Sequence, residues 1–409
     1  MDKNNRKTTF CEYLYALDSR VISKMIETLK TDRYVKKLDS LKFLKLFIYA
    51  QLKQIESLTD ISLDLKTNKK LQKEIGLKSI STATLSRKLG SISPDLFKAI
   101  FHHLVQKLHR HFGVKKSNEA LGKIHLIDSS TISLALSKHR WADFRPTKAG
   151  VKLHLRVVFC EDVTYPDKLM VTPARPADVT QLDTLIVEEQ GALHVFDRGY
   201  FDFEKFDEYC AKGIRFVTRL KENTVIQIID EVPIEPDSSI MREAVVKIGK
   251  MKHPLRLVET RDTQGNLIRI VMNDAKISAE EISDLYRNRW QIELFFKWMK
   301  QHLVVKRIFG QSSQAVENQI FLAMITFCLT LLMKQTLSFD GSLWTLQKYL
   351  RMCWHLALST LKRELFRKPT RKSKGRKKLD HERIFKETLL QYENQECEHL
   401  DDLKYDPIH

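Results

Sequence analysis

The spacing of apolar residues changes near residue 121, and this change most constrains how the chain can fold. Before it, "KKLDSLKFLKLFIYAQLKQI" places an apolar residue at every third or fourth position, which predicts helix. After it, "KIHLIDSSTISL", "GVKLHLRVVFC" and "DKLMVTPAR" are rich in β-branched residues and predict three strands, the last two separated by a turn at "TYPD". We therefore expect a wholly helical region over residues 1–120, followed by a region that contains a sheet.

Helices and strands are expected to alternate after these three strands. "ADVTQLDTLIVEEQ" predicts a helix capped by Asp178, and "ALHVFD" predicts a strand. "DFEKFDEYCAKG" predicts a further helix, and "IRFVTRL" a further strand. The order βββαβαβ is typical of an α/β fold with a mixed sheet. Short alternating segments over residues 223–274 predict a β-rich insertion in this region, which spans residues 121–310.

The segment "LQKEIGLKSISTATLSRKLGSI" predicts two short helices joined by a turn. Gly76 is suited to end the first helix, and Ser81 or Thr82 to cap the second. The second helix is expected to present Thr84, Ser86, Arg87 and Lys88. Two interpretations stay open: a helix-turn-helix that reads a DNA major groove, and an ordinary helical hairpin with a solvated basic face.

The charge of the chain favours a polyanionic partner. Its 69 Lys and Arg residues exceed 51 Asp and Glu residues, giving a net charge of +18 and a pI near 9.5. Residues 362–378 hold ten Lys or Arg and one acid, which suits contact with a nucleic-acid backbone, although a solvated tail would look the same. No apolar run of 18 residues and no CxxC pair is found, so we expect a cytosolic protein without a zinc site.

Three acids lie where chemistry could use them. Asp128 ends "IHLID", Asp197 ends "LHVFD" and opens "DRGY", and Glu293 lies on a later helix. Carboxylates at strand ends project into the cleft where α/β proteins bind ligands. Hard oxygen ligands suit Mg²⁺, and two such ions can support cleavage and transfer of a phosphodiester. Taken singly, each aspartate is also an ordinary turn or cap residue.

The stretch "YRNRWQIELFFKWMK" carries charged residues on a helix that is apolar over most of its circumference. At about 100° per residue, its polar positions fall within roughly 80° of one another. They are Tyr286, Arg289, Glu293, Lys297 and Lys300. This pattern predicts a packed helix whose narrow open side faces a cleft. A surface ladder of ion pairs at four-residue spacing is the simpler alternative.

The spacing Tyr286-x2-Arg289-x3-Glu293-x6-Lys300 resembles the Y-x2-R-x3-E-x6-K signature of DDE transposases of bacterial insertion sequences, in the insertion sequence 4 group. "IHLIDSSTI" and "HVFDRGYFD" are similar to the first and second acidic motifs of that group. The resemblance covers roughly residues 30–330. It implies a ribonuclease H-like catalytic core, preceded by a helical accessory domain that binds DNA.

The resemblance also implies roles for single residues. Asp128, Asp197 and Glu293 would hold two Mg²⁺ ions, with Mn²⁺ as a substitute. Tyr286, Arg289 and Lys300 would contact phosphates of the cleaved DNA end. Water would attack at the ends of the element, and the freed 3′-hydroxyl would attack target DNA. A homodimer would pair two ends in the bacterial cytoplasm at the nucleoid, with the helices of residues 311–366 as candidate dimer contacts and residues 367–409 as a basic, then acidic tail.

Two other functions remain as alternatives. One is a transposase-derived protein that binds DNA without cleaving it, and the other is a nuclease on a ribonuclease H-like fold. Some single residues are also open to two interpretations. Trp290 and Trp298 could stack on a displaced base or belong to the core. Lys152 and Arg198 are candidate phosphate contacts. His125 and His154, on strands near the acids, are expected to be structural.

Overall fold

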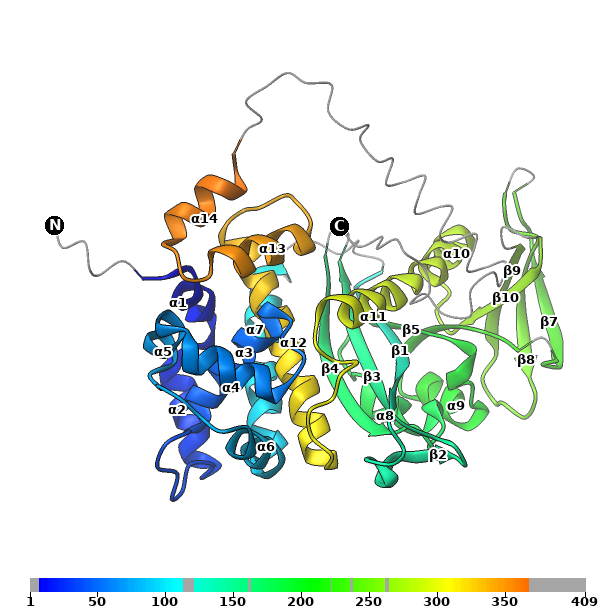
Figure 1. Cartoon of the computed structure of the whole chain (residues 1–409). Coiled ribbons are helices and arrows are strands. Elements are labelled where there is room, and N and C mark those ends of the chain that lie inside the picture. The colour runs from blue at the N-terminus through cyan, green and yellow to red at the C-terminus, as the bar shows by residue number, and fades with distance from the viewer. Residues whose placement is uncertain are drawn as a thin grey trace.

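A bundle of helices lies beside an α/β unit in the computed structural model (Figure 1). The prediction of helices followed by a mixed sheet is confirmed. Most of the basic run 362–378 and the acidic tail lie outside the described residues. The structure describes residues 7–112, 121–160, 163–221, 223–235, 238–261 and 265–367.

The helical bundle is built from both ends of the chain. Residues 311–366, expected as a C-terminal unit, contribute helices to the same body as the N-terminal region. The N-terminal helices are α1 (Thr9–Tyr13), η1 (Leu14–Leu17), α2 (Ser19–Thr28), α3 (Ser40–Lys53), α4 (Leu58–Thr67), α5 (Lys69–Ile75), α6 (Thr82–Ser91) and α7 (Pro94–Phe112). The C-terminal helices are α12 (Ser313–Thr336), α13 (Leu343–Cys353) and α14 (Leu358–Leu365).

Helix α12 is the centre of this bundle and packs against α3, α6 and α7. Among the described residues it is the one helix long and apolar enough to cross a membrane by length and composition, and 94% of its most apolar window is buried inside the protein. Thr326 and Thr330 do not interrupt it, because each hydroxyl donates to the carbonyl four residues earlier. The Tyr13 hydroxyl donates to the Thr326 carbonyl at 2.8 Å, so these polar groups are satisfied within the bundle.

The two short helices predicted after residue 70 are confirmed as α5 and α6. Gly76 ends α5 with a left-handed φ of 70°. The Ser81 hydroxyl caps α6 by accepting the amide of Thr84 at 3.2 Å. Leu85 and Leu89 are fully buried and hold α6 in the bundle. Helix α6 is therefore a packed element with one outer face.

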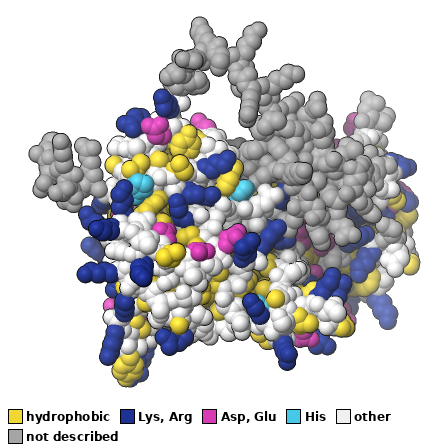
Figure 2. All heavy atoms as spheres, in the orientation of Figure 1, with side chains coloured by type: hydrophobic (Ala, Val, Ile, Leu, Met, Phe, Trp, Pro, Cys, Tyr) yellow, Lys and Arg dark blue, Asp and Glu magenta, His cyan; other side chains and the backbone are white. Residues whose placement is uncertain are grey.

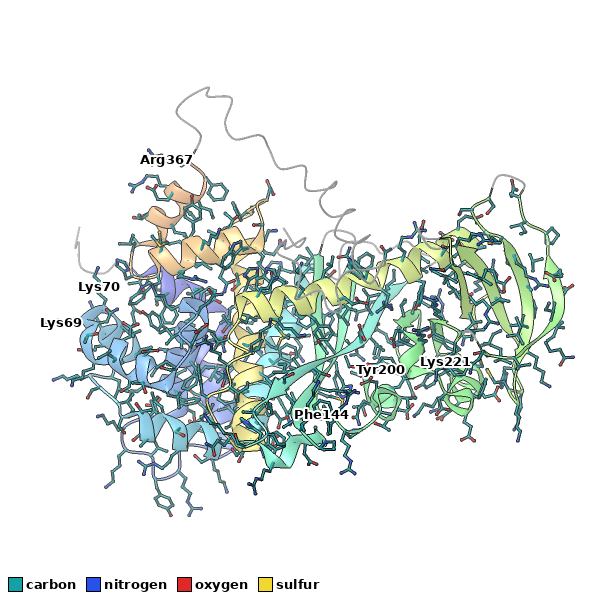
Figure 3. All side chains as sticks on the ribbon, turned by 45° about the vertical axis from the view of Figure 1, so that its right-hand side comes forward. Lys69, Lys70, Phe144, Tyr200, Lys221 and Arg367 are labelled. Atoms are coloured by element: carbon teal, nitrogen blue, oxygen red, sulfur yellow. The ribbon has the colours of Figure 1, made fainter. Side chains whose placement is uncertain are left out.

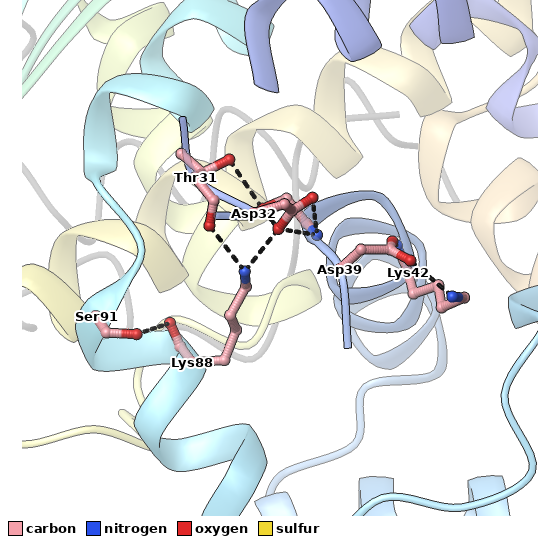
Figure 4. Close-up of polar contacts among 7 residues, drawn as sticks. Thr31, Asp32, Asp39, Lys42, Lys88 and Ser91 are labelled. Atoms are coloured by element: carbon pink, nitrogen blue, oxygen red, sulfur yellow. Dashed lines mark hydrogen bonds and ion pairs between the residues drawn. The ribbon is translucent and has the colours of Figure 1, made fainter. Parts of the chain in front are cut away.

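Lys88 does not lie on that outer face, so the expectation that α6 presents it is wrong. Its Nζ lies 2.9 Å from Oδ1 of Asp32 and also contacts the carbonyl of Thr31 (Figure 4). Asp32 in turn accepts hydrogen bonds from Ser40 at the start of α3. Arg87, the neighbouring base, is exposed. Asp32, in the loop before α3, thus binds one of the two basic residues of α6 and leaves the other exposed.

A mixed ten-stranded sheet forms the α/β unit. Strands β1, β5 and β6 are parallel to one another, and all other neighbours are antiparallel. The order across the sheet is β2-β3-β1-β5-β6-β10-β9-β8-β7, with β4 also paired to β3. The strands are β1 (Lys123–Leu134), β2 (Asp143–Arg145), β3 (Lys148–Cys160), β4 (Val163–Pro173), β5 (Ala192–Phe196), β6 (Arg215–Arg219), β7 (Ile226–Val232), β8 (Arg242–Ile248), β9 (Leu255–Arg261) and β10 (Leu267–Met272).

The β-rich segment predicted over residues 223–274 is present as β7 to β10. It extends the main sheet, because β10 pairs with β6 through Ile270 to Met272. These strands lie at the far end of the molecule from the helical bundle (Figure 1).

Two local predictions were wrong. The "TYPD" segment is not a turn but lies inside β4, where a register shift at Arg156 and Val157 accommodates Pro166, which has no amide proton to donate. The helix expected after residue 177 is only η3 (Asp178–Gln181) and α8 (Leu182–Leu185). Asp178 does not cap it, because its carboxylate binds Ser129 instead.

Helices cover both faces of the sheet. One face packs against α8 and α9 (Phe203–Ala211), around Phe196, Phe206 and Phe216. The other face is crossed by α10 (Ala279–Asn288) and α11 (Trp290–His302), which run from the β7–β10 end towards the helical bundle (Figure 1). Ser278 and Glu281 form the predicted capping box of α10. The single helix expected here is divided at Arg289, where a tight turn separates α10 from α11.

Candidate active site

Asp128 and Asp197 follow the last paired residues of two neighbouring parallel strands. The ladder between β1 and β5 ends at Ile127 and Phe196, so the two aspartates occupy the next position on each strand. Asp128 does not end its strand as expected, because β1 continues to Leu134 through its pairing with β3. The two carboxylates therefore lie where β1 and β5 separate, at the edge of the sheet where ligands bind in α/β folds.

Helices α10 and α11 bring Glu293 to the same place. Helix α10 packs over β5 and β6, and α11 packs over β1. The junction at Arg289 therefore lies above the boundary between β1 and β5. Glu293, one turn into α11, is placed on the side of the helix that faces the sheet.

One guanidinium joins two of the three acids. Nη1 of Arg289 lies 3.4 Å from Oδ2 of Asp128, and Nη2 lies 2.5 Å from Oε1 of Glu293. The side chains of Arg289, Asp128 and Glu293 are only 18%, 15% and 13% exposed. The structure thus brings an acid of β1 and an acid of α11 to opposite sides of a single cation.

The charges of this group act strongly on one another. Burial raises the pKa of Asp128 well above its usual value; Arg289 opposes this shift, and Glu293 and Asp197 add to it. Burial lowers the pKa of Arg289, but Glu293, Tyr286, Asp128 and Asp197 together raise it well above its usual value. Like charges thus oppose the ionisation of Asp128, and Arg289 is a cation that offsets this repulsion.

Asp197 is held by the turn that follows it. Its Oδ1 accepts the amide of Gly199 at 2.9 Å, and the Thr218 hydroxyl contacts its carbonyl at 3.3 Å. A Cβ at position 199 would lie 2.9 Å from the same Oδ1, closer than side chains pack. Gly199 is therefore required for this carboxylate position. Sequence reasoning missed this role, although the glycine of "DRGY" was a visible signal.

The donor chemistry of this group suits a divalent metal ion. Carboxylate oxygens are the preferred protein ligands of Mg²⁺ and Mn²⁺. As the side chains of the described residues stand, no three His, Cys, Asp or Glu are close enough together to hold an ion. The guanidinium of Arg289 lies between Asp128 and Glu293.

The family described as "Transposase DDE domain" matches residues 120–329, which include all three acids. The chain belongs to this family of transposases. It is thus an enzyme that acts on DNA, in a family that generally uses divalent metal ions. A second family, a domain of unknown function (DUF4372), matches residues 5–78 in the helical bundle.

Two relatives are similar to the transposase over much of its length. A protein of Geobacillus stearothermophilus, named a probable transposase for insertion sequence element IS5377, is 30% identical over 262 residues, covering 62% of this chain and 67% of the relative. A protein of Sinorhizobium fredii named as a transposase, y4zB, is 34% identical over 220 residues, covering 52% of this chain and 61% of the relative.

A solved structure also aligns with most of the transposase. It is the cryo-EM structure of the piggyBac transposase synaptic complex with hairpin DNA, and the alignment covers 90% of this chain and 84% of that one. The TM-score is 0.45 and the sequence identity 11%, which is too distant a likeness to compare individual elements.

The other polar residues of the stripe lie at different distances from the acids. Tyr286 packs at the junction with its ring centroid 5.9 Å from the Arg289 guanidinium. Burial raises the pKa of Tyr286, an effect to which Asp197 adds. Lys300 lies about 10 Å along α11 from Glu293, at 1.5 Å rise per residue. Lys297 is only 1% exposed, so it is not on an open side of the helix as predicted.

Of the two tryptophans of uncertain role in the transposase, Trp290 is half-buried at the start of α11. Trp298 is 1% exposed and packs against His302 and Phe327, so it belongs to the core. His125 and His154 are buried. Arg198 is exposed beside Asp197 and lines a hollow of about 610 Å³ together with Gly199, Lys221 and Asn223 (Lys221 is labelled in Figure 3).

Proposed function

We propose that this transposase binds the terminal inverted repeats of an insertion sequence of the insertion sequence 4 group and catalyses cut-and-paste transposition. The observation that carries this proposal is the shared guanidinium. Asp128 and Glu293, which are 165 residues apart in the sequence, bind opposite sides of Arg289 beside the end of the strand that leads into Asp197. Such a group of mutually repelling carboxylates has no structural purpose that an apolar contact would not serve better.

The fold of the core supports the same proposal. Within the ten-stranded sheet, β4, β3 and β1 form an antiparallel series in which β1 and β3 are long, and β5 and β6 then join β1 in parallel. We infer that these five strands are a ribonuclease H-like core. The strands β7 to β10 are then an insertion at its β6 edge, between the second acid and the third.

Asp128, Asp197 and Glu293 would hold two Mg²⁺ ions, and Mn²⁺ would substitute. When bound, such ions activate an attacking oxygen and stabilise the leaving one, first for water and then for the freed 3′-hydroxyl. The protein's own contribution is position: Gly199 fixes the Asp197 carboxylate, and the amide of Ser129 donates to Oδ1 of Asp128 at 2.7 Å. Two of the ligands are then fixed by backbone amides before the ions arrive.

Arg289 would change partners during this process. In the protein alone Nη1 lies beside Asp128 and Nη2 binds Glu293, and the same two nitrogens can bind a single phosphate. Once divalent ions neutralise the acids, Arg289 is able to bind a phosphate of the cleaved DNA end. Tyr286 beside it and Lys300 further along α11 would contact phosphates on the same strand, and Arg198 and Lys221 would do so across the hollow beside Asp197.

The helical bundle would bind the DNA away from the cut. Residues 1–120 are proposed as the accessory DNA-binding region, because five lysines of the α4–α5 surface and its following turn are exposed. Lys69 and Lys70 point away from the protein in Figure 3, and Figure 2 shows Lys and Arg side chains spread over this half of the molecule. The five residues are Lys66, Lys69, Lys70, Lys73 and Lys78.

The assembly on DNA is proposed to be a homodimer that holds two element ends at the nucleoid in the cytoplasm. Helix α12 is buried in its own bundle and offers little surface to a second copy. Within residues 311–366, the exposed apolar side chains Met352 and Phe366 make α13 and α14 the better candidates.

The test uses duplexes that carry the ends of the insertion sequence from which the chain derives, incubated with Mg²⁺, with every nick mapped. Asp128→Asn, Asp197→Asn and Glu293→Gln should each abolish nicking while leaving binding of the duplex nearly unchanged, because each removes a metal ligand without altering shape. If a variant nicks DNA at the wild-type rate, the residue replaced in it is not a metal ligand. Wild-type protein that binds ends without nicking them would instead indicate a DNA-binding protein, and cleavage without end preference a general nuclease.

A further inference from the structure

A fourth acid, Asp178, lies close to the candidate site on the opposite face of the sheet. Its Oδ1 accepts the hydroxyl of Ser129 at 2.8 Å and lies 2.9 Å from Nζ of Lys152. Lys152 also donates to the carbonyl of Pro176, which ties β3 to the segment before η3. Asp178 therefore binds residues of β1 and β3 and is not a helix cap.

Ser129 connects this acid to Asp128. Its hydroxyl donates to Asp178, and its backbone amide donates to Oδ1 of Asp128 at 2.7 Å. The two side chains point to opposite faces because successive residues of a strand alternate. A shift of Ser129 would thus move the amide that orients the Asp128 carboxylate.

The position of Ser129 needs such a tether, because β1 loses one neighbour here. The parallel ladder with β5 ends at Ile127, so beyond this residue β1 is paired only with β3, where Ser129 lies opposite His154. His154 is fully buried, and its Nδ1 lies 3.7 Å from Oδ1 of Asp178. Asp178 therefore holds β1 from the face of the sheet opposite Asp128, at the point where β1 and β5 separate.

Lys152 offsets the electrostatic repulsion that the Asp178 carboxylate would otherwise add at this place. Asp178 lies near the negative group formed by Asp128, Asp197 and Glu293, and an unpaired carboxylate there would add to their repulsion. The ammonium group of Lys152, whose side chain is only 18% exposed, compensates this charge. The role expected for Lys152, contact with a DNA phosphate, is thus replaced by a contact within the protein.

We propose that Asp178 is a positioning residue that orients the Asp128 carboxylate through Ser129. This inference rests on the proposed function, in which Asp128 is a metal ligand. Groups that hold a metal ligand in this way typically contribute 10- to 100-fold to metal affinity. Asp178 touches neither DNA nor metal in this account and acts only by holding Ser129.

The experiment titrates the full-length protein with Mn²⁺ alone and follows the free ion by electron paramagnetic resonance. Asp178→Ala and Ser129→Ala should each raise the Mn²⁺ midpoint by about 10-fold or more, since each removes one partner of the same hydrogen bond. The double variant should bind Mn²⁺ no more weakly than the weaker-binding single variant, because the same chain of contacts can be lost only once. Additive losses would contradict the proposed connection.

Asp183→Ala is the matched control. Asp183 also pairs with a lysine, Lys205, and accepts a hydroxyl, that of Tyr209 at 2.6 Å, but it has no contact with Ser129. Its Mn²⁺ midpoint should equal that of the wild type. If Asp178→Ala lowers the unfolding temperature yet keeps the wild-type Mn²⁺ midpoint, the role of Asp178 is merely structural and the inference is wrong. Wild-type protein that binds no Mn²⁺, or binds it equally well after Asp128→Asn, would overturn the proposed function itself.

Discussion

Two buried regions of this transposase, helix α12 and the α10–α11 pair, carry polar side chains, and these side chains bind different kinds of partner. In α12, the amide of Asn318 donates to the carbonyls of Leu89 and Ile92 at 2.8 and 2.9 Å. In the α10–α11 pair, Arg289 and Glu293 bind each other, and Arg289 also binds Asp128 on β1. The first arrangement joins neutral groups to the backbone, and the second joins charges to charges.

This difference separates structure from function in the molecule. A buried amide that binds backbone carbonyls has no better partner, so it fixes the packing of α6 against α12. Carboxylates and a guanidinium have competing partners of equal or greater strength, namely divalent cations and phosphates. We therefore expect metal and DNA to rearrange the α10–α11 group and to leave the α12 contacts unchanged.

The largest effect on stability is expected at Arg289. Arg289→Ala leaves Asp128 and Glu293 facing each other without a cation, which should cost about 3–5 kcal/mol in the presence of a chelator. Millimolar Mn²⁺ should restore much of this loss, because the ion takes the place of the guanidinium. Thermal unfolding with and without Mn²⁺ measures both quantities. A loss that Mn²⁺ does not reduce would show that the acids are not held for a cation.

Asn318→Ala tests the contacts between neutral groups in α12. It leaves two buried carbonyls without donors, which should cost about 2–4 kcal/mol. Here Mn²⁺ should leave the difference from the wild type unchanged, because the acids and Arg289 are intact in both proteins and bind the ion equally. Gln106→Ala on the exposed surface of α7 is the control and should stay within about 0.5 kcal/mol of the wild type. Urea unfolding followed by circular dichroism provides the measurement.

Gly199→Ala tests the position of a single carboxylate. The added methyl group would lie 2.9 Å from Oδ1 of Asp197 and must displace it. Displacement of a reacting group by a fraction of an ångström to an ångström lowers rates by up to about 100-fold, so nicking should fall by about 10- to 100-fold. DNA binding should be unchanged in a mobility-shift assay. Gly90→Ala in α6 is the control, because its φ, like that of Gly199, lies outside the left-handed region and its added Cβ makes only an ordinary contact, 3.4 Å from Oγ of Ser312.

The smallest effect distinguishes two adjacent bases on α6. Arg87 is exposed, so Arg87→Ala should lower the salt dependence of DNA binding by about one charge if α6 contacts DNA. Lys88→Ala should leave that slope unchanged and reduce stability by about 1 kcal/mol, because Lys88 binds Asp32. Equal slopes for both variants and the wild type would favour the simple helical hairpin over a helix-turn-helix.

The sequence predicted most of the local elements correctly where one periodicity dominated. The helices around Leu44 and Leu85, the capping box at Ser278 and the parallel strands before Asp197 followed from spacing and capping residues. It failed where a distant partner decided the outcome. Asp178 looked like a helix cap because its partner, Ser129, is 49 residues away.

The site shows the same limit. Spacing placed Arg289 and Glu293 on one face of a helix, but only the fold shows that Arg289 lies between Glu293 and Asp128. Lys88 and Lys152 looked like DNA contacts because their acidic partners, Asp32 and Asp178, come from other segments. Residue type and period therefore gave the candidate residues, and only the tertiary contacts show which of their charges are paired within the protein.

The central claim is that Asp128, Asp197 and Glu293 form one metal site from which Arg289 is displaced. A crystal structure of the transposase with a cleaved element end and Mn²⁺, with anomalous scattering recorded at the manganese edge, tests it directly. We predict manganese peaks in contact with all three carboxylates and Arg289 bound to a DNA phosphate. Manganese bound elsewhere, with Arg289 still between Asp128 and Glu293, would contradict it.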